Sequence, residues 1–165
     1  MSQVYVEELL KRRGVGIESI AEIVFHLQHG YYPDLTLEEC AESVRAVLQK
    51  REVQYTLYTG IALDELAEKR LLPPPLQEMM EADEPLFGVD ETLALGITSV
   101  YGMIGLTSFG YVDKDKTGIM KLLNNKEQGV HVFLDDLVAG LAAAASARIA
   151  HRNAGARHYP TPERS

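Results

Sequence analysis

A stretch of 21 residues without a charged side chain, from Thr92 to Val112, is the strongest constraint on how this chain can fold. As a helix it would be long enough to cross a bilayer, but four glycines and several Thr and Ser residues dilute its apolar character. Acidic residues stand at both ends, Glu91 and Asp113, and no second segment of this kind accompanies it. We therefore expect a buried central helix in preference to a membrane span, with glycines that let neighbouring helices approach closely.

Helical patterns dominate the rest of the chain, and no alternating pattern bounded by hairpin turns indicates strands. Thr36 followed by Glu39 predicts a capping box at a helix start. Helices are expected over 5–13, 53–70, 76–82, 119–125 and 130–150, and two more should begin near Ile17 and Thr36. The predicted fold is all-α, a single multi-helix domain over residues 1–152, followed by a disordered tail over 153–165.

The composition restricts the classes of partner. A net charge of −8 offers no basic patch for nucleic acid, and it allows at most a peripheral contact with a membrane. Cys40 is the one cysteine, so no internal disulfide can form, and the start of the chain lacks the apolar core of a signal peptide. We expect a cytoplasmic protein. If it handles a phosphorylated small molecule or lipid head group, it needs local positive charge, which a bound cation supplies.

The most informative pair is Asp135-Asp136, which lies in an apolar helical segment. Two carboxylates about 5 Å apart repel each other by roughly 1 kcal/mol in water and by more in a drier site. One of them must therefore be protonated, paired with a base or bound to a cation. The alternative is a helix N-cap, in which either aspartate accepts backbone N–H bonds.

Two further acidic elements flank the uncharged stretch. Asp90-Glu91 precedes it and, on pattern alone, complements the dipole of a helix N-terminus. The turn that follows it offers Asp113 as a metal-binding acid and Lys116 as a cation for phosphate, or is simply a solvated turn. A calcium loop is disfavoured because its twelfth position is Asn124 instead of glutamate.

Carboxylates of this kind suit Mg²⁺ or Mn²⁺, which can bridge phosphate oxygens and activate water. The sequence offers no nucleophile motif and no phosphate-binding glycine loop. His131 stands one helical turn before Asp135 and is expected to be structural, and Cys40 is expected in the core.

In order and spacing these motifs resemble the phosphatidylglycerophosphatase A family. The resemblance is carried by Asp90-Glu91, by the stretch 109–116 (FGYVDKDK), by Gly129 and by the stretch 133–140 (FLDDLVAG). The stretches 51–54 (REVQ), 59–64 (TGIALD) and 100–105 (VYGMIG) are similar to its soluble branch, which includes low-temperature-requirement C proteins.

The resemblance implies a Mg²⁺-dependent hydrolase that converts phosphatidylglycerophosphate to phosphatidylglycerol and phosphate. It places metal ligands at Asp90, Glu91, Asp113, Asp135 and Asp136, and the family's lysine at Lys116. We assign catalytic roles to Asp113, Lys116 and Asp136. The family and the small-residue helices also suggest a homo-oligomer, either a dimer or a tetramer.

Two other functions remain open at this point. The stretch 38–42 (EECAE) matches part of the signature of all-α nucleotide pyrophosphohydrolases, but its partner motif Glu-x-x-Asp is absent from the sequence. The chain could also be a non-catalytic helical oligomer or regulatory module whose acids are caps and surface charge.

Overall fold

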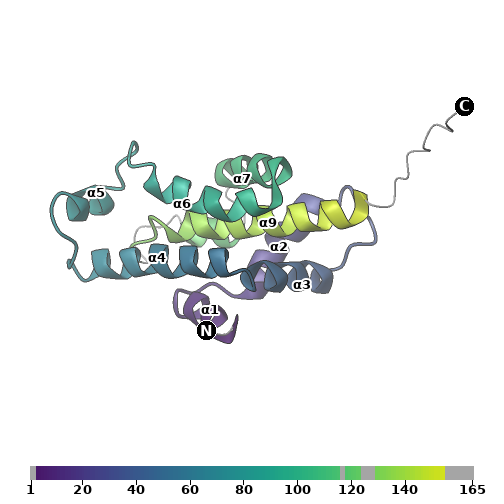
Figure 1. Ribbon diagram of the computed structural model, residues 1–165, viewed down its shortest axis with the longest axis horizontal. Helices are drawn as coiled ribbons and strands as arrows, with labels where there is room; N and C mark the ends of the chain where they lie inside the picture. Colours follow the sequence, from purple (N-terminus) through teal and green to yellow (C-terminus); the bar gives the residue numbers. More distant parts are fainter. Residues whose placement is uncertain (1–2, 116–117, 124–128, 155–165) are drawn as a thin grey trace, which may run out of the picture.

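The computed structural model describes residues 3–115, 118–123 and 129–154. Within these ranges every regular element is a helix, which confirms the all-α prediction (Figure 1). The helices are α1 (Gln3–Arg12), α2 (Ile17–Gln28), α3 (Leu37–Leu48), α4 (Arg51–Glu68), α5 (Leu76–Ala82), α6 (Val89–Thr98), the 3₁₀ turn η1 (Ser99–Tyr101), α7 (Met103–Asp115), α8 (Ile119–Leu123) and α9 (Leu134–Ala154).

The capping box at the start of α3 forms as predicted. The amide of Glu39 donates to Thr36 Oγ1 at 3.2 Å, and the amide of Thr36 donates to Glu39 Oε2 at 2.9 Å. This motif is local in sequence, so its residues alone are sufficient to specify it.

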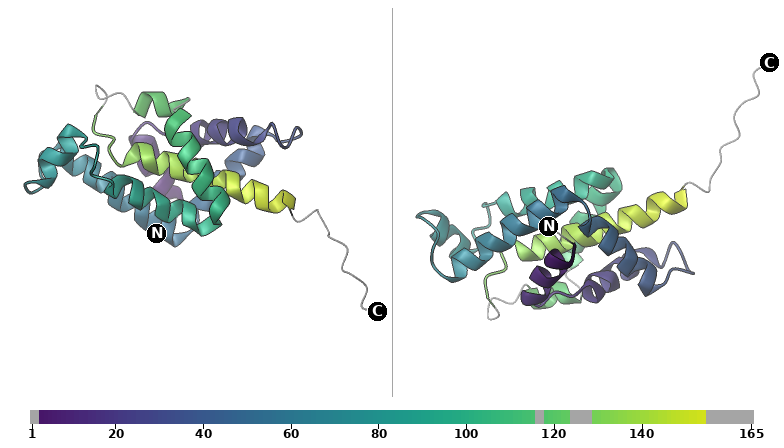
Figure 2. Two further views of the ribbon diagram at one scale, coloured as in Figure 1. Left: turned by 90° about the horizontal axis from the view of Figure 1, so that it is seen from above. Right: turned by 60° about the horizontal axis from the view of Figure 1, so that its bottom comes forward.

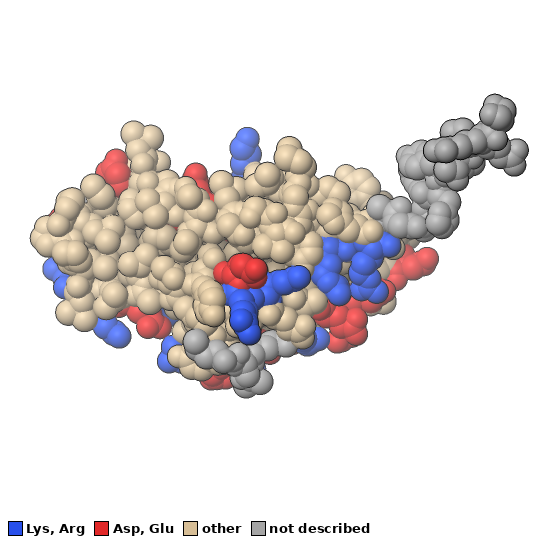
Figure 3. All heavy atoms as spheres, in the orientation of Figure 1, with Lys and Arg blue, Asp and Glu red and all other residues tan. Residues whose placement is uncertain are grey.

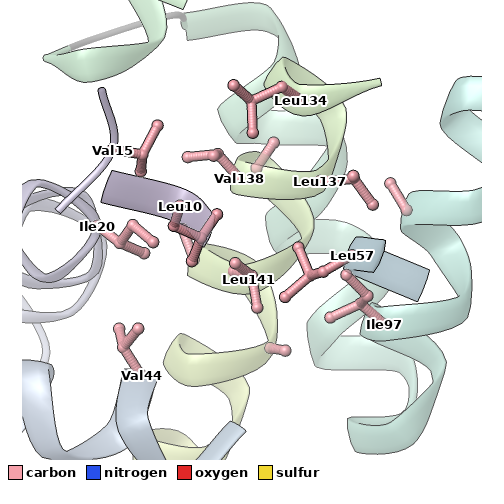
Figure 4. Close-up of a cluster of buried hydrophobic side chains, with 14 of the residues drawn as sticks. Leu10, Val15, Ile20, Val44, Leu57, Ile97, Leu134, Leu137, Val138 and Leu141 are labelled. Carbon is pink, nitrogen blue, oxygen red and sulfur yellow. The ribbon is translucent and has the colours of Figure 1, made fainter. Parts of the chain in front are cut away.

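The central helix of the fold is α9, which packs against α2, α3, α4, α6, α7 and α8 (Figures 1 and 2). Its side chains from Leu137 to Ala145 are buried. The many alanines let neighbouring helices approach its axis on every side. The larger side chains interdigitate around it in Figure 4, where Leu134, Leu137, Val138 and Leu141 meet Leu10, Val15, Ile20, Val44, Leu57 and Ile97.

The uncharged stretch 92–112 differs from the expectation of one buried central helix. It is divided into α6, η1 and α7, and eleven of its 21 residues are exposed. The break falls at Gly102, whose φ of 74° lies in the left-handed region that glycine favours. None of the described helices combines the length and apolar character that a bilayer span requires.

α6 and α9 run side by side and in the same direction, in contact at a glycine (Figure 1). A Cβ added at Gly140 would stand 3.0 Å from the carbonyl oxygen of Ala94. Ala94 follows Asp90 by four residues and Gly140 follows Asp135 by five, so at 1.5 Å per residue both aspartates lie about 6–8 Å before this contact. The close approach therefore brings the two acidic N-termini to the same level.

The N-terminus of α9 is capped by a residue of α4. Asp64, which is fully buried, accepts hydrogen bonds from the amide of Phe133 to Oδ1 at 3.0 Å and from the amide of Leu134 to Oδ2 at 2.9 Å. Burial raises the pKa of Asp64 to about 7, although the two amides and the nearby Arg13 guanidinium act in the opposite direction. The cap thus joins two helices that are distant in sequence.

A second link holds the segment that enters α9. The Arg13 guanidinium donates to both carboxylate oxygens of Glu68, at 2.7 and 3.0 Å, and to the carbonyl oxygen of Val130 at 2.8 Å. The amide of Val130 donates in turn to Glu68 Oε1 at 3.0 Å. The hydrogen bond from Arg13 lowers the pKa of Glu68, so the pair stays ionised and fixes residues 129–131 against α1 and α4.

We expect Gly140→Ala to destabilise the fold by about 1 kcal/mol. The added methyl group meets backbone, which costs roughly 1–3 kcal/mol, and the better helix propensity of alanine offsets up to about 1 kcal/mol. Urea denaturation at one low protein concentration measures the change. The control is Gly96→Ala, where an added Cβ has no atom within 4 Å and should be neutral or stabilising. Equal behaviour of the two variants would contradict the tight contact.

Removing the cap with Asp64→Ala should lower the free energy of unfolding by about 2–4 kcal/mol, because two buried amides lose their acceptor. Asp64→Asn keeps one acceptor oxygen, so its free energy of unfolding should fall by less than that of Asp64→Ala. Chemical denaturation of the three proteins at pH 8 gives the comparison. A loss for Asp64→Ala no larger than that of an exposed substitution, about 0.5 kcal/mol, would exclude the cap as a main support of α9.

The buried carboxyl also predicts a dependence on pH. The pKa of Asp64 is higher in the folded state (about 7) than its ordinary value of 3.8, so the folded state takes up this proton first. The stability of the wild type relative to Asp64→Asn should therefore rise as the pH falls from about 7 to about 4, by roughly 1 kcal/mol per pH unit. Denaturation of both proteins across this range tests it; a constant difference would show that the pKa is not raised.

Candidate functional site

A pocket of about 130 Å³ lies where α6 and α9 begin, and it brings Asp90 and Asp135 together. Both aspartates are partly buried. Its remaining walls come from α5 and the turn after it, from α8, and from the segment that enters α9. The other lining residues are Met80, Glu81, Asp83, Leu123, Gly129, Val130, His131 and Val132.

The acidic pair stands in the first turn of α9, but neither member is its N-cap. Asp64 fills that role by accepting from the amides of Phe133 and Leu134, while Asp135 Oδ1 accepts from the amide of Asp136 at 2.8 Å. Asp135 lines the pocket, whereas Asp136 is buried at 6% exposure and does not line it. Adjacent residues on a helix point about 100° apart, so one residue of the pair lines the pocket while the other is buried away from it.

The amides at this helix end are already occupied. Those of Phe133 and Leu134 donate to Asp64, that of Asp135 to the carbonyl oxygen of His131 at 3.4 Å, and that of Asp136 to Asp135. A helix N-terminus binds phosphate through free N–H groups, and here these four amides have other acceptors. A phosphate beside α9 would therefore have to be held by other means.

The second acidic pair opens α6. Gly88 precedes the helix with a φ of 62°, a left-handed conformation suited to glycine. Asp90 Oδ1 accepts from the amide of Glu91 at 3.0 Å, and Asp90 lines the pocket. Glu91 is exposed and does not line it. Of the two predicted metal ligands in this pair, the structure therefore brings only Asp90 to the pocket.

The third predicted element is placed only in part. Asp113 belongs to the last turn of α7, but its side chain is not described, and Lys116 lies outside the described residues. Asn124, which argued against a calcium loop, also lies outside them. The roles predicted for Asp113 and Lys116 stay predictions.

Several residues of the pocket were missed by the sequence reasoning. Glu81 and Asp83 add two carboxylates from the end of α5, and Glu81 is also held by Gln77 Nε2 at 2.8 Å and Arg70 Nε at 3.1 Å. His131, which the sequence analysis expected to be structural, also lines the pocket, and its Nδ1 lies 3.4 Å from the Arg13 guanidinium. Asp64 was noted only as part of the family-like stretch TGIALD; its spacing carries no sign of a cap, because its partners lie about 70 residues away.

The donor set fits a hard divalent cation. Within the described ranges no three His, Cys, Asp or Glu side chains form a ready-made metal cluster. Mg²⁺, however, usually keeps several waters and binds through one or two protein carboxylates together with substrate phosphate. Asp90 and Asp135, facing one pocket from two helices, meet that requirement.

Comparison with known proteins connects this geometry to a family. The family model for phosphatidylglycerophosphatase A matches residues 9–151. Uncharacterized protein YpjQ from Bacillus subtilis strain 168 is 57% identical over 145 residues, 88% of this chain and 82% of that protein. Uncharacterized protein YutG from the same organism is 56% identical over 150 residues, 90% of this chain and 89% of that protein.

Solved structures share the fold as well. The crystal structure of the low temperature requirement C protein from Listeria monocytogenes has a TM-score of 0.89 to this chain, with 50% sequence identity. The match covers 92% of this chain and 96% of that protein. These findings confirm the resemblance drawn from the acidic motifs, and they show that the chain belongs to the phosphatidylglycerophosphatase A family.

Proposed function

We propose that this protein is a Mg²⁺- or Mn²⁺-dependent phosphatase that hydrolyses a phosphomonoester. The observation that carries the proposal is the charge of the pocket, where the carboxylates of Glu81, Asp83, Asp90 and Asp135 surround one small space. A phosphate group entering that space would be repelled unless a cation accompanied it. Membership of the phosphatidylglycerophosphatase A family supports the same reaction class.

Asp90 and Asp135 would hold the cation at the pocket, with Glu91, Asp136 and Asp113 as the further acids of the site. When bound, the cation neutralises charge on the phosphate and on the leaving oxygen. Asp136 is buried, and its amide, which donates to Asp135 Oδ1 at 2.8 Å, would fix the direction of its neighbour. The roles of Glu91 and Asp113 rest on the family resemblance.

Hydrolysis requires a water oxygen to form a bond to phosphorus while the ester P–O bond breaks. Asp113 would accept the proton of the attacking water, and the leaving alkoxide would regain a proton from solvent. Lys116 would bind the phosphate oxygens as a point charge. Positioning and electrostatic stabilisation are the main requirements of phosphoryl transfer, so this set is sufficient without a protein nucleophile.

The substrate we propose is phosphatidylglycerophosphate, cleaved to phosphatidylglycerol. A pocket of about 130 Å³ is smaller than the roughly 300–1,000 Å³ of pockets that enclose a drug-sized ligand. It could therefore take the phosphate end of a head group while the acyl chains stay outside. A water-soluble phosphomonoester such as a glycerol phosphate would fit the same space.

The test is phosphate release from phosphatidylglycerophosphate in detergent, from glycerol phosphates and from nucleotides. We expect phosphate release with Mg²⁺ and none with EDTA. In Asp136→Asn and Asp90→Asn the rate of release should fall by about 10- to 100-fold, the effect typical of changing a metal ligand or a residue that supports one. The matched control is Asp34→Asn, an exposed acid outside the pocket, which should keep full activity.

Mn²⁺ binding measured by calorimetry gives a readout that does not depend on guessing the substrate. The wild type and Asp34→Asn should bind, and Asp135→Asn should bind more weakly. Release of phosphate that persists in EDTA, or divalent binding unchanged in Asp135→Asn, would contradict the proposed metal site.

A further inference from the structure

A recess of about 250 Å³ opens beside the acidic pocket, lined by the end of α1 and by α8. Arg12 and Arg13 are among its lining residues, and none of the described residues that line it is Asp or Glu. Ile119 and Leu122 of α8 supply apolar walls. Because apolar surroundings strengthen the interactions of charges, this recess suits an anion, whereas the neighbouring pocket suits a cation.

The recess and the acidic pocket share two of their walls. His131 and Leu123 line both of them. A molecule that is bound in the pocket can therefore extend past these two side chains into the recess. The charges of the two spaces are opposite, because four carboxylates line the pocket and two arginines line the recess. A ligand with two anionic groups can thus place one group with a cation in the pocket and the other beside the arginines.

Arg12 has N–H donors to offer such a ligand. Its side chain is 56% exposed, and its ion pair with Glu65 has an N–O distance of 3.7 Å. This distance is longer than a hydrogen bond, and Glu65 does not line the recess. A guanidinium presents its N–H groups in a rigid fork that matches the oxygens of a phosphate. An anion in the recess can therefore bind Arg12 without replacing a hydrogen bond of the described chain.

Arg13 is held in a fixed position where it lines the recess. Its side chain is 10% exposed, and its two terminal nitrogens donate to the Glu68 carboxylate and to the carbonyl oxygen of Val130. Its Nε is buried and has no hydrogen-bond partner among the described residues. A buried donor without an acceptor is costly, and an anionic oxygen in the recess can supply that acceptor.

The net charge of −8 does not prevent an anion from binding at this place. Figure 3 shows that charged side chains of both signs gather along the lower part of the molecule, where α1 lies in Figure 1. Exposed charges are largely screened from each other beyond about 10 Å at 0.1 M salt. The charges that line the recess therefore matter more than the total, and a cation in the acidic pocket would add to them.

The proposed substrate carries a second phosphate that fits this arrangement. Phosphatidylglycerophosphate ends in a phosphomonoester, which a glycerol unit joins to a phosphodiester. The acidic pocket would take the phosphomonoester together with a cation, while arginines bind a phosphodiester without one. Glycerol phosphate has a single phosphate group and would leave the recess empty. The recess therefore favours a phosphomonoester that carries a second phosphate.

We propose that Arg12 and Arg13 form a subsite that binds a second phosphate group of the substrate, beside the acidic pocket. The inference rests on the proposed phosphatase function and names the class of substrate that this function selects. Arg12 contributes available donors, and Arg13 contributes a fixed charge. Neither residue takes part in breaking the ester bond, so the subsite acts on substrate affinity.

Steady-state kinetics of Arg12→Gln test the subsite. The substrates are glycerol phosphate and glycerophosphoglycerol phosphate, the water-soluble head group of phosphatidylglycerophosphate. For the head group KM should rise about 10-fold, because a charge-assisted hydrogen bond is lost, while kcat changes less. The rise for glycerol phosphate should be several-fold smaller. Rises of equal size for the two substrates would overturn the inference.

A nucleoside bisphosphate with its phosphates on separate hydroxyl groups tells the two sources of a second phosphate apart. If its KM rises in Arg12→Gln as much as that of the head group, the subsite is supported as one for any second phosphate. A rise with the head group alone supports a subsite for the phosphodiester of a lipid.

The matched control is Lys11→Gln, which removes the neighbouring exposed charge of α1 outside the recess and should behave as the wild type. Both variants should keep the helical circular dichroism of the wild type, because exposed ion pairs contribute little to stability. Arg13 is left unchanged because it also holds Val130. An equal rise of KM in Arg12→Gln and Lys11→Gln would show a general effect of charge and would overturn the subsite.

Calorimetry with glycerophosphoglycerol separates the subsite from the phosphatase activity, because this phosphodiester has no phosphomonoester to hydrolyse. With Mg²⁺ present it should bind to the wild type and to Lys11→Gln, and about 10-fold more weakly to Arg12→Gln. This pattern without phosphate release from any substrate would contradict the proposed function and support an anion site. Hydrolysis of the head group, combined with equal binding to all three proteins or with no binding, would overturn the subsite and leave the proposed function standing.

Discussion

The cap that Asp64 places on α9 is the interaction on which the rest of the structure depends. Its carboxyl group is fully buried, and removal of such a group from water is tolerated only where hydrogen bonds replace the lost solvation. The amides of Phe133 and Leu134 provide them, and they lie at the start of the helix around which most others pack. One pair of bonds therefore fixes both the core helix and the direction of the acids that follow it.

Local patterns in the sequence predicted much of the fold. The all-α class, the Thr36–Glu39 capping box and the approximate extent of most helices depend on residues within a turn or two of each other. Long-range contacts leave no such pattern in the sequence. The role of Asp64 as a hydrogen-bond acceptor could not be predicted, because its partners lie about 70 residues away. The prediction of one buried helix over the uncharged stretch was wrong, because a lack of charge shows only that a segment tolerates burial. In the structure Gly102 interrupts the stretch, and about half of its residues are exposed.

The candidate site was predictable to a similar degree. Asp90 and Asp135 line one pocket, while their neighbours Glu91 and Asp136 do not line it; the metal-binding roles of all four stay predictions. Helical geometry allows only one residue of an adjacent pair to face a given side, but it does not tell which one. Glu81 and Asp83 were missed since their surroundings read as an ordinary helix end and turn, and only the tertiary fold carries them to the pocket.

The position of the acids at two helix starts has an electrostatic consequence. Each N-terminus carries about half a positive charge, which attracts the acidic side chains of Asp90 and Asp135 in the first turns of α6 and α9. Two such ends offset roughly one negative charge, whereas four carboxylates line the pocket. Arg70 balances one of these charges through its ion pair with Glu81 at 3.1 Å, and the others still exceed what the helix ends alone can offset. At the start of α9, the amides that could otherwise attract a phosphate are already bonded to Asp64, His131 and Asp135. Under the proposed function, the pocket would therefore bind a cation first, and a phosphate only together with that cation.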